Sequence, residues 1–174
     1  PAKFLGFDIF IRRSNDLRKD INGKTIRSLG HVPVLYLNYE TMRKKLFDYK
    51  AARIAVENGK EIWKSIVRTY MIDLDDLEIV SQFNAEIRGF YNYYSIANNS
   101  PAINSFYHIM SYSMYKTFAR KYKSSVKKIL FQYKKDGTFK VAYENSKGKT
   151  LYQSFYHDGF KRKKIAGATS CDTI

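Results

Sequence analysis

The fold is decided by residues 73–118, which read DLDDLEIVSQFNAEIRGFYNYYSIANNSPAINSFYHIMSYSMYKTF. This stretch opens with Asp73 at the position of a helix N-cap, and more acids follow in the first turn, where the helix dipole favours negative charge. Apolar residues then recur at helical spacing, at Leu77, Val80, Ile87, Tyr91 and Tyr94. Asn98 and Asn99 end this helix, and Ser100 with Pro101 begins a second, because proline is tolerated at the first helical position. A link this short predicts two antiparallel helices.

Further helical patterns lie around this pair. The second helix carries a stripe long enough to be buried, at Ile103, Phe106, Tyr107, Met110, Met114 and Phe118. A third stripe, with lysines on the opposite face, lies at Val126, Ile129, Leu130 and Tyr133. Upstream, Asn38 is placed to cap a helix over residues 39–53, which has Met42, Leu46, Tyr49 and Arg53 at helical spacing.

Extended segments precede the helices. Residues 4–11 form an apolar, β-rich run that predicts a strand. The polar residues 13–24 after it contain turn signals, so a hairpin that returns through residues 25–29 is expected. Residues 32–37 are another candidate strand.

Turn signals also divide the rest of the chain. An Asn-Gly pair at residues 58–59 predicts a turn ahead of residues 62–67, and an Asp-Gly pair at 136–137 ends the helical pattern. Residues 138–143 and 150–156 then predict a short hairpin with a basic turn. The whole pattern predicts an α+β chain, mainly α, with a helical bundle and flanking β-hairpins.

The composition excludes several classes of protein. The chain has 174 residues, a formal charge of +15 and a hydrophobic fraction of 44%, which is too high for intrinsic disorder. Its longest uncharged stretch, residues 89–115, is interrupted by polar residues, so no run of about 20 apolar residues could cross a bilayer. The single cysteine, Cys171, excludes an internal disulfide and a cysteine-based zinc site made by this chain alone, and favours a reducing compartment.

The positive charge is unevenly distributed. Residues 1–72 carry a net +8 and residues 101–174 a net +11, whereas residues 73–100 between them carry a net −4. Eight basic residues fall within 116–135, ahead of the next acid at Asp136. A solvated helix face normally intersperses glutamates as i,i+4 partners, and none is present there. We therefore interpret this basic segment as a binding surface for a polyanion. The alternative is a helix face on which lysines are simply solvated.

Aromatic residues make up 16% of the chain, with 15 tyrosines and 12 phenylalanines. Rings beside cations suit nucleic acid, because bases stack on the rings while lysine and arginine neutralise phosphates. The alternative for any single ring is that it belongs to the core, which is the common case.

Catalytic and metal-binding signatures are missing from the sequence. The acidic cluster at residues 73–78 lacks the glycine-containing loop of a calcium site, so helix capping explains it better. His31, His108 and His157 have no HxxxH or HExxH spacing and are expected to be structural or surface residues. No phosphate-binding loop and no hydrolase elbow occurs. The residues alone therefore indicate a binding module.

Two blocks of sequence resemble a known family. Residues 85–94 read AEIRGFYNYY and residues 115–123 read YKTFARKYK. They resemble the R-G-x-x-N-Y-Y and K-T-x-A-x-K-x-K elements of the maturase-specific region, domain X, in group II intron reverse transcriptases. The FLGF of residues 4–7 is similar to a block that closes the palm of the same proteins. The order and spacing agree from residue 3 to residue 164, and Phe118 stands where a leucine is often found.

The resemblance implies a domain organisation. It assigns residues 1–37 to the end of the palm, 38–135 to a thumb made of a three-helix bundle, 136–160 to a β-hairpin extension and 161–174 to a basic tail or linker. Such a thumb grips the template-primer duplex and, during splicing, binds intron RNA. The catalytic aspartates of the family lie upstream in the palm, so we expect this chain to be part of a longer protein and inactive as a polymerase alone.

The resemblance also implies partners and surroundings. The expected partners are group II intron RNA, the template-primer nucleic acid, and the finger and palm domains upstream, without a membrane. No cofactor is expected for this chain, while the parent polymerase is expected to need Mg²⁺. A bacterial cytoplasm is the first expectation for its location and an organelle the second.

The resemblance and the charge pattern together predict the RNA contacts. These are Arg88, Asn92, Tyr93, Lys116, Thr117, Arg120, Lys121, Lys123, Lys127 and Lys128. Lys121, Lys123, Lys127 and Lys128 are predicted to be helical, clustered and unpaired by acids, and to act without base specificity. Thr117 is expected to donate its hydroxyl to the RNA backbone.

Two of these predictions carry alternatives. Asn92 has a second interpretation as a tie between helices. Tyr93 and Tyr94 lie about 100° apart on their helix, so at most one of them can be fully buried.

Two other functions compete with this interpretation. A general RNA-packaging or ribosome-associated protein would use the same lysines but bind any structured RNA equally. A DNA-binding endonuclease or integrase is disfavoured, because the sequence offers no set of metal ligands.

Overall fold

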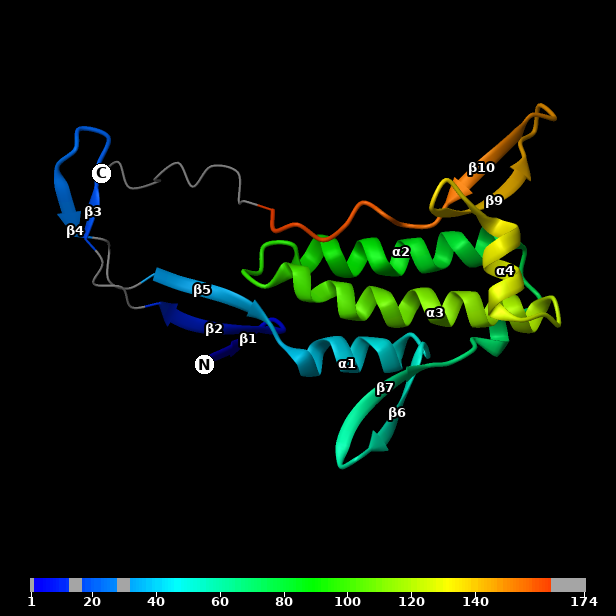
Figure 1. Ribbon diagram of the computed structural model, residues 1–174, viewed down its shortest axis with the longest axis horizontal. Coiled ribbons are helices and arrows are strands. Elements are labelled where there is room, and N and C mark those ends of the chain that lie inside the picture. The colour runs from blue at the N-terminus through cyan, green and yellow to red at the C-terminus, as the bar shows by residue number, and fades with distance from the viewer. Residues whose placement is uncertain (1, 13–16, 28–31, 164–174) are drawn as a thin grey trace.

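The computed structural model describes residues 2–12, 17–27 and 32–163 (Figure 1). Within them the chain has four α-helices and short antiparallel sheets, which confirms the predicted α+β class. The helices are α1 (Tyr39–Asp48), α2 (Asp76–Tyr94), α3 (Ile103–Lys121) and α4 (Val126–Tyr133), with 3₁₀ turns η1 (Thr69–Met71) and η2 (Ser100–Ala102). The strands are β1 (Ala2–Phe4), β2 (Phe7–Arg12), β3 (Leu17–Lys19), β4 (Thr25–Arg27), β5 (Val32–Leu37), β6 (Ala52–Glu57), β7 (Lys60–Ser65), β8 (Lys134–Lys135), β9 (Thr138–Glu144) and β10 (Thr150–Ser154).

Some predictions fall outside the described residues. They concern parts of the first hairpin, the histidine at position 31 and the tail from residue 164 onward, which contains the cysteine.

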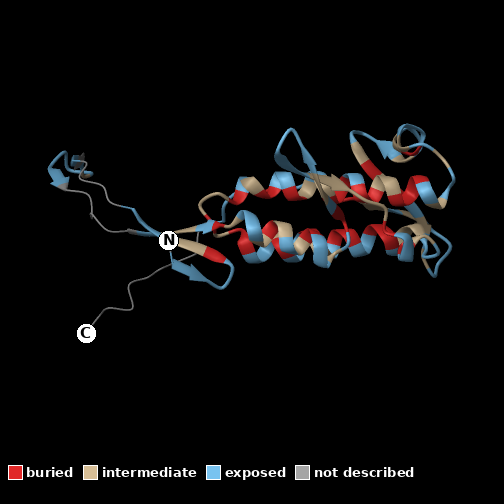
Figure 2. Ribbon diagram, turned by 90° about the horizontal axis from the view of Figure 1, so that it is seen from below, coloured by how far each residue is buried: buried red, intermediate tan, exposed pale blue. Residues whose placement is uncertain are grey.

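The helices form the centre of the molecule. α2 and α3 lie side by side and run antiparallel, as their short link predicts, and α1 packs along α3 (Figure 1). The buried residues face the inside of this layer (Figure 2). Its most deeply buried rings are Phe83, Phe106 and Phe118, each with no exposed surface. The short α4, eight residues long, packs on α3 and runs across the helices rather than along them.

The helix starts differ in detail from the prediction. α2 is capped by Asp75 rather than Asp73, and its partner Glu78 accepts a hydrogen bond from the Asp75 backbone N–H at 3.2 Å. This is a capping box, in which the side chain of each residue accepts a hydrogen bond from the backbone N–H of the other. Both aspartates offer the same chemistry, but only Asp75 has a glutamate three residues later.

The next two helices also depart from the expected boundaries. Ser100 and Pro101 open the 3₁₀ turn η2, so α3 itself begins at Ile103. Asn38 caps α1 as predicted, because its Oδ1 accepts from the Glu40 backbone N–H at 2.7 Å. α1 nevertheless ends at Asp48, well before the predicted end, and the positions after it turn into strand β6.

The first sheet has the order β1-β2-β5 and is antiparallel throughout. The single strand predicted over residues 4–11 is wrong, since Leu5 and Gly6 make a turn with φ of 49° and 81°. A Cβ at Gly6 would lie 2.4 Å from the Tyr94 hydroxyl, so this position needs glycine for its space as well as its φ. The turn therefore fits against the end of α2, and Tyr93 donates from its hydroxyl to the Leu5 carbonyl at 3.0 Å.

Two hairpins, β3-β4 and β6-β7, and a three-stranded antiparallel sheet of order β10-β9-β8 complete the described fold. The predicted hairpin over residues 138–156 is confirmed, and its two strands contact α2. The buried Phe139 ring packs on α3 and α4, with its centroid 5.1 Å from those of Phe118 and Tyr133. The buried Asn84 of α2 holds its last strand, since its amide donates to the Ser154 carbonyl and its Oδ1 accepts from the Tyr156 N–H, both at 2.8 Å. Among the described residues no helix is long and apolar enough to cross a membrane.

We expect stability to fall at alkaline pH through Tyr115. Burial raises the pKa of this tyrosine from 10.0 to about 12. The unfolded chain therefore ionises first, so the contribution of Tyr115 is complete below pH 10 and is lost as the pH rises towards about 12. Urea unfolding across this window should show a falling midpoint, and Tyr115→Phe should flatten that fall. Identical pH curves for the two proteins would contradict this assignment.

Candidate nucleic-acid interface

A basic groove lies where α3 ends, and we call it the α3 groove. It has a volume of about 780 Å³. It is lined by Val67, Ile72, Asp73, Lys116, Ala119, Arg120, Lys121, Lys123, Ser124 and Val126. The structure thus brings together four of the ten predicted RNA contacts, because Lys116, Arg120 and Lys121 lie on the last two turns of α3 and Lys123 lies in the loop into α4. The prediction that Lys123 is helical is therefore wrong.

Two of the four cations in the α3 groove are partly held by the protein. Lys116 Nζ donates to the Ser65 carbonyl at 2.7 Å. Lys121 Nζ donates to Asp76 Oδ1 and to the Leu74 carbonyl, each at 2.7 Å. The expectation that Lys121 has no acidic partner is therefore wrong, since Asp76 is sequence-distant but neighbouring in space.

The remaining cations of this region point into solvent. Arg120 and Lys123 of the groove are exposed, and so are Lys127 and Lys128 on the outer face of α4. Within the part of the chain that the structure describes, none of these four forms a salt bridge. We call these four side chains the basic cluster. At this end of the molecule, these four are the predicted contacts that remain free to neutralise phosphates.

Asp76 joins the three elements that frame the groove. Its Oδ1 pairs with Lys121, and its Oδ2 accepts from the hydroxyls of Tyr122 at 2.7 Å and Tyr133 at 2.8 Å. The start of α2, the end of α3 and the end of α4 therefore meet at one carboxylate. Burial raises the pKa of Tyr133, and the hydrogen bonds with Tyr122 and Asp76 raise it further. Both tyrosines thus remain hydrogen-bond donors at physiological pH.

We expect Asp76→Asn to destabilise the chain by about 1–3 kcal/mol, since hydrogen bonds to a charged group are lost or weakened. Thermal unfolding of this variant measures the loss. Asp73→Asn is the matched control, because Asp73 is an exposed acid at the same groove. It should change stability by no more than about 0.5 kcal/mol. Equal unfolding free energies for the two variants would show that Asp76 does not join the three helices.

Thr117 is the clearest correction to the predicted site. Its side chain is fully buried, its hydroxyl donates to the Ser113 carbonyl at 2.8 Å, and it accepts from the Arg68 backbone N–H at 3.0 Å. Because an RNA strand cannot reach this hydroxyl, Thr117 is a structural residue of α3. The motif of residues 115–123 therefore has an exposed side that carries basic residues and a buried side that carries Thr117.

Arg88 and Asn92 lie away from the α3 groove, on a second surface formed by α2. They line a smaller cavity of about 340 Å³ with Tyr156 and Lys163. The guanidinium of Arg88 lies 6.0 Å from the Tyr156 ring centroid, and Lys163 Nζ donates to Asn92 Oδ1 at 3.3 Å. The Lys163 backbone N–H also donates to the Ser95 carbonyl at 2.8 Å. The first residues of the predicted tail are thus bound to the end of α2.

Tyr93 and Tyr94 behave as their angular separation predicts. Tyr94 is buried, whereas Tyr93 is 49% exposed. The Tyr93 ring stacks on Phe7 with centroids 5.7 Å apart, and its hydroxyl is bonded to the β1–β2 turn. Tyr93 therefore holds the first sheet against α2 and keeps only part of its ring accessible.

A buried charge pair was missed by the sequence reasoning. Arg68 has 1% exposure, and its Nη2 lies 2.7 Å from Glu86 Oε2. Its guanidinium carbon lies 4.0 Å from the centroid of the Phe83 ring, and Nη2 lies 3.5 Å from Met110 Sδ. The only sequence signal for this pair is an arginine in an apolar segment ahead of η1. Its role is to fix the segment after β7 between α2 and α3.

No group of three or more His, Cys, Asp or Glu side chains that could hold a metal ion occurs within residues 2–12, 17–27 and 32–163. The acids at the start of α2 are engaged in capping and in the bonds of Asp76. The surface formed by the α3 groove and the basic cluster can therefore bind anions through its exposed cations.

Known proteins with similar sequences agree with this picture. The sequence profile described as type II intron maturase matches residues 35–166. The group II intron-encoded protein LtrA of Lactococcus lactis is 36% identical over 150 residues, which cover 86% of this chain and 24% of LtrA. A putative COX1/OXI3 intron 1 protein of Saccharomyces cerevisiae is 31% identical over 134 residues, or 71% of this chain and 15% of that protein.

These similarities place the chain in the broad class of intron-encoded proteins. The chain belongs to the group II intron maturase family, as its resemblance to domain X predicts. It spans about a quarter of the length of LtrA.

Proposed function

We propose that this chain is the maturase region, or thumb, of a group II intron-encoded reverse transcriptase, and that it binds intron RNA to promote splicing. The observation that carries the proposal is the basic cluster of Arg120, Lys123, Lys127 and Lys128, which is exposed beside the α3 groove. Four cations that form no salt bridge with the described acids, gathered at one end of the helical layer, suit the closely spaced phosphates of a folded RNA.

The protein contributes affinity and shape selection in this proposal, and the RNA carries out the splicing chemistry. A protein that binds the folded intron better than its misfolded forms shifts the population towards the folded one by its difference in affinity. Lysines and arginines that contact phosphates supply position without base specificity. Recognition of one intron therefore depends on the shape of the surface that carries the cations.

We further propose that residues 38–135, which hold the four helices, act as the thumb of the longer protein, and that the same basic end follows the template-primer duplex during DNA synthesis. The sheet β1-β2-β5 exposes Phe4, Leu5 and Ile11 by more than half, which suits contact with an upstream palm. The Mg²⁺ of the polymerase reaction would be held in that palm. The cytoplasm of a bacterium or an organelle fits an intron-binding protein.

Competition between RNAs tests the proposal. A labelled group II intron RNA bound to the 174-residue chain is challenged with excess unlabelled intron or with an unrelated structured RNA of equal length. We expect the intron to compete at a concentration at least about tenfold lower, which corresponds to about 1.4 kcal/mol of discrimination. Equal competition would overturn intron specificity and leave a general structured-RNA-binding protein, the alternative function.

A further inference from the structure

α4 carries a phenylalanine, Phe131, on its exposed face, away from the apolar stripe that packs on the core. Phe131 is 92% exposed, whereas Ile129 two residues earlier is 1% exposed. The inner face of α4 is occupied by Ile129 together with Leu130 and Tyr133, which pack on the core. Phe131 therefore contributes little to folding.

The position of Phe131 on α4 places it among cations. At about 100° per residue, Phe131 lies about 40° from Lys127 and about 60° from Lys128 around the helix axis, between the two. Both lysines are exposed members of the basic cluster. A single exposed ring on a protein surface is common, so its neighbourhood and not its exposure carries the inference.

A second exposed ring, on the neighbouring β9-β10 hairpin, also lies beside a lysine. Tyr152 is 55% exposed, and Lys135 Nζ lies 5.1 Å from its ring centroid. The register of β8, β9 and β10 puts Lys135 and Tyr152 on the outer face of the sheet, opposite the buried Phe139 and Val141. α4 runs directly into β8, so Lys135 follows Phe131 by four residues.

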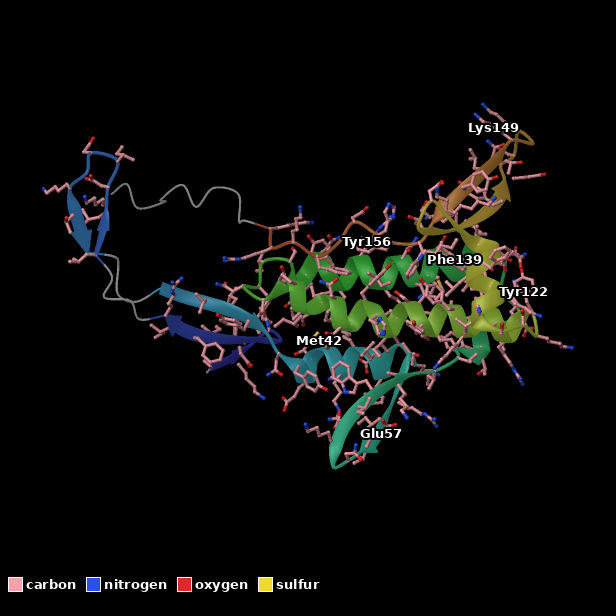
Figure 3. The ribbon with its side chains drawn as sticks, in the orientation of Figure 1. Met42, Glu57, Tyr122, Phe139, Lys149 and Tyr156 are labelled. Atoms are coloured by element: carbon pink, nitrogen blue, oxygen red, sulfur yellow. The ribbon has the colours of Figure 1, made fainter. Side chains whose placement is uncertain are left out.

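The hairpin extends this basic region away from the helices. Figure 3 shows Lys149 towards the far end of β9 and β10, beyond the helical layer. Acidic residues are scarce around this hairpin. In the described part of the chain, only Asp136 forms a salt bridge with one of the hairpin's lysines, Lys140. Charge complementarity therefore favours a polyanion over a protein partner on this face.

We propose that Phe131 and Tyr152 stack on unpaired bases of the RNA whose phosphates the surrounding lysines hold. The inference rests on the proposed function and narrows its substrate to RNA that offers single-stranded loops or bulges beside the helical parts. Bases within a duplex have both faces covered, whereas an unpaired base can stack on an aromatic ring. A ring next to cations binds the base and its phosphate together.

The test compares two RNAs of equal length on the 174-residue chain, a hairpin with a large unpaired loop and a blunt duplex. Phe131→Ala and Tyr152→Ala should each weaken binding of the looped RNA by about 5- to 150-fold, the range for one lost base stack. Duplex binding should change less than about twofold, and the salt dependence should stay the same because no phosphate contact is removed.

Two control variants accompany the measurement. Phe131→Trp keeps a stacking ring and should retain the affinity for looped RNA. Val56→Ala changes a side chain that is 71% exposed on the β6-β7 hairpin and should leave both affinities unchanged. Thermal unfolding of Phe131→Ala should match that of the unchanged chain, because the ring is in solvent.

The outcomes separate this inference from the proposed function. Unchanged or equally reduced affinities for loop and duplex would overturn stacking, and unchanged affinities would assign the rings to a protein contact. The proposed function would survive either result as long as the unchanged chain binds RNA with a steep salt dependence. Failure of the unchanged chain to bind a group II intron RNA would instead overturn the proposed function itself.

Discussion

Arg68→Ala is expected to lower the free energy of unfolding by about 3–5 kcal/mol, because removing one partner of a buried ion pair leaves the other charge uncompensated. The partner here is Glu86, whose side chain is only 10% exposed. The variant also loses the cation over the Phe83 ring and leaves space between α2 and α3. Urea unfolding followed by circular dichroism measures the effect.

A double variant separates the charge from the packing. Arg68→Met with Glu86→Leu replaces the pair with apolar groups of similar size, and such exchanges are often neutral or stabilising. We expect the double variant to recover most of the stability that Arg68→Ala loses. A loss below about 1 kcal/mol for Arg68→Ala would contradict the buried pair, since it would lie within the range of ordinary surface contacts.

Removal of the basic cluster should weaken RNA binding by about 200- to 900-fold at about 0.15 M salt, if each of four phosphate contacts scales affinity with salt to a power of about 0.7 to 0.9. The variant is Arg120→Ala, Lys123→Ala, Lys127→Ala and Lys128→Ala in one chain. Its salt slope should be shallower by about 2.8 to 3.6. Its stability should change little, because these side chains are exposed.

The matched control removes the same charge elsewhere. Lys19, Lys44, Arg53 and Lys60 are exposed and lie on β3, α1, β6 and β7, away from the basic cluster. Changing these four to alanine should cost far less affinity, because only long-range attraction is reduced and salt screens it beyond about 10 Å. Equal losses for the two variants would mean that the total charge of +15 binds RNA, without a defined surface.

Local patterns were enough to predict the helical part of the fold. The apolar stripes of α2, α3 and α4 follow helical periodicity, and Asn38 announces the start of α1. The strand over residues 4–11 could not be predicted correctly, since its break at Gly6 depends on the close approach of Tyr94, which is distant in sequence. The early end of α1 has a local cause instead, because the residues that follow it pair in the β6-β7 hairpin.

The candidate site could be predicted only where exposure follows from helix position. Lys127 and Lys128 lie opposite an apolar stripe, so the pattern of α4 alone places them in solvent. Thr117 and Lys121 belong to the same motif as exposed cations, yet contacts with Arg68 and Asp76 place one in the core and the other in an ion pair. Sequence spacing carries no information about such tertiary partners.

The central claim is that the basic end of this chain binds RNA by neutralising its phosphates. Filter binding of the 174-residue chain to a group II intron RNA, repeated from about 50 to about 200 mM salt, tests it most directly. The basic cluster predicts a slope of log affinity against log salt of about −2.8 or steeper, which is at least about a 50-fold loss across that range. An affinity that stays constant across the same range would contradict the claim.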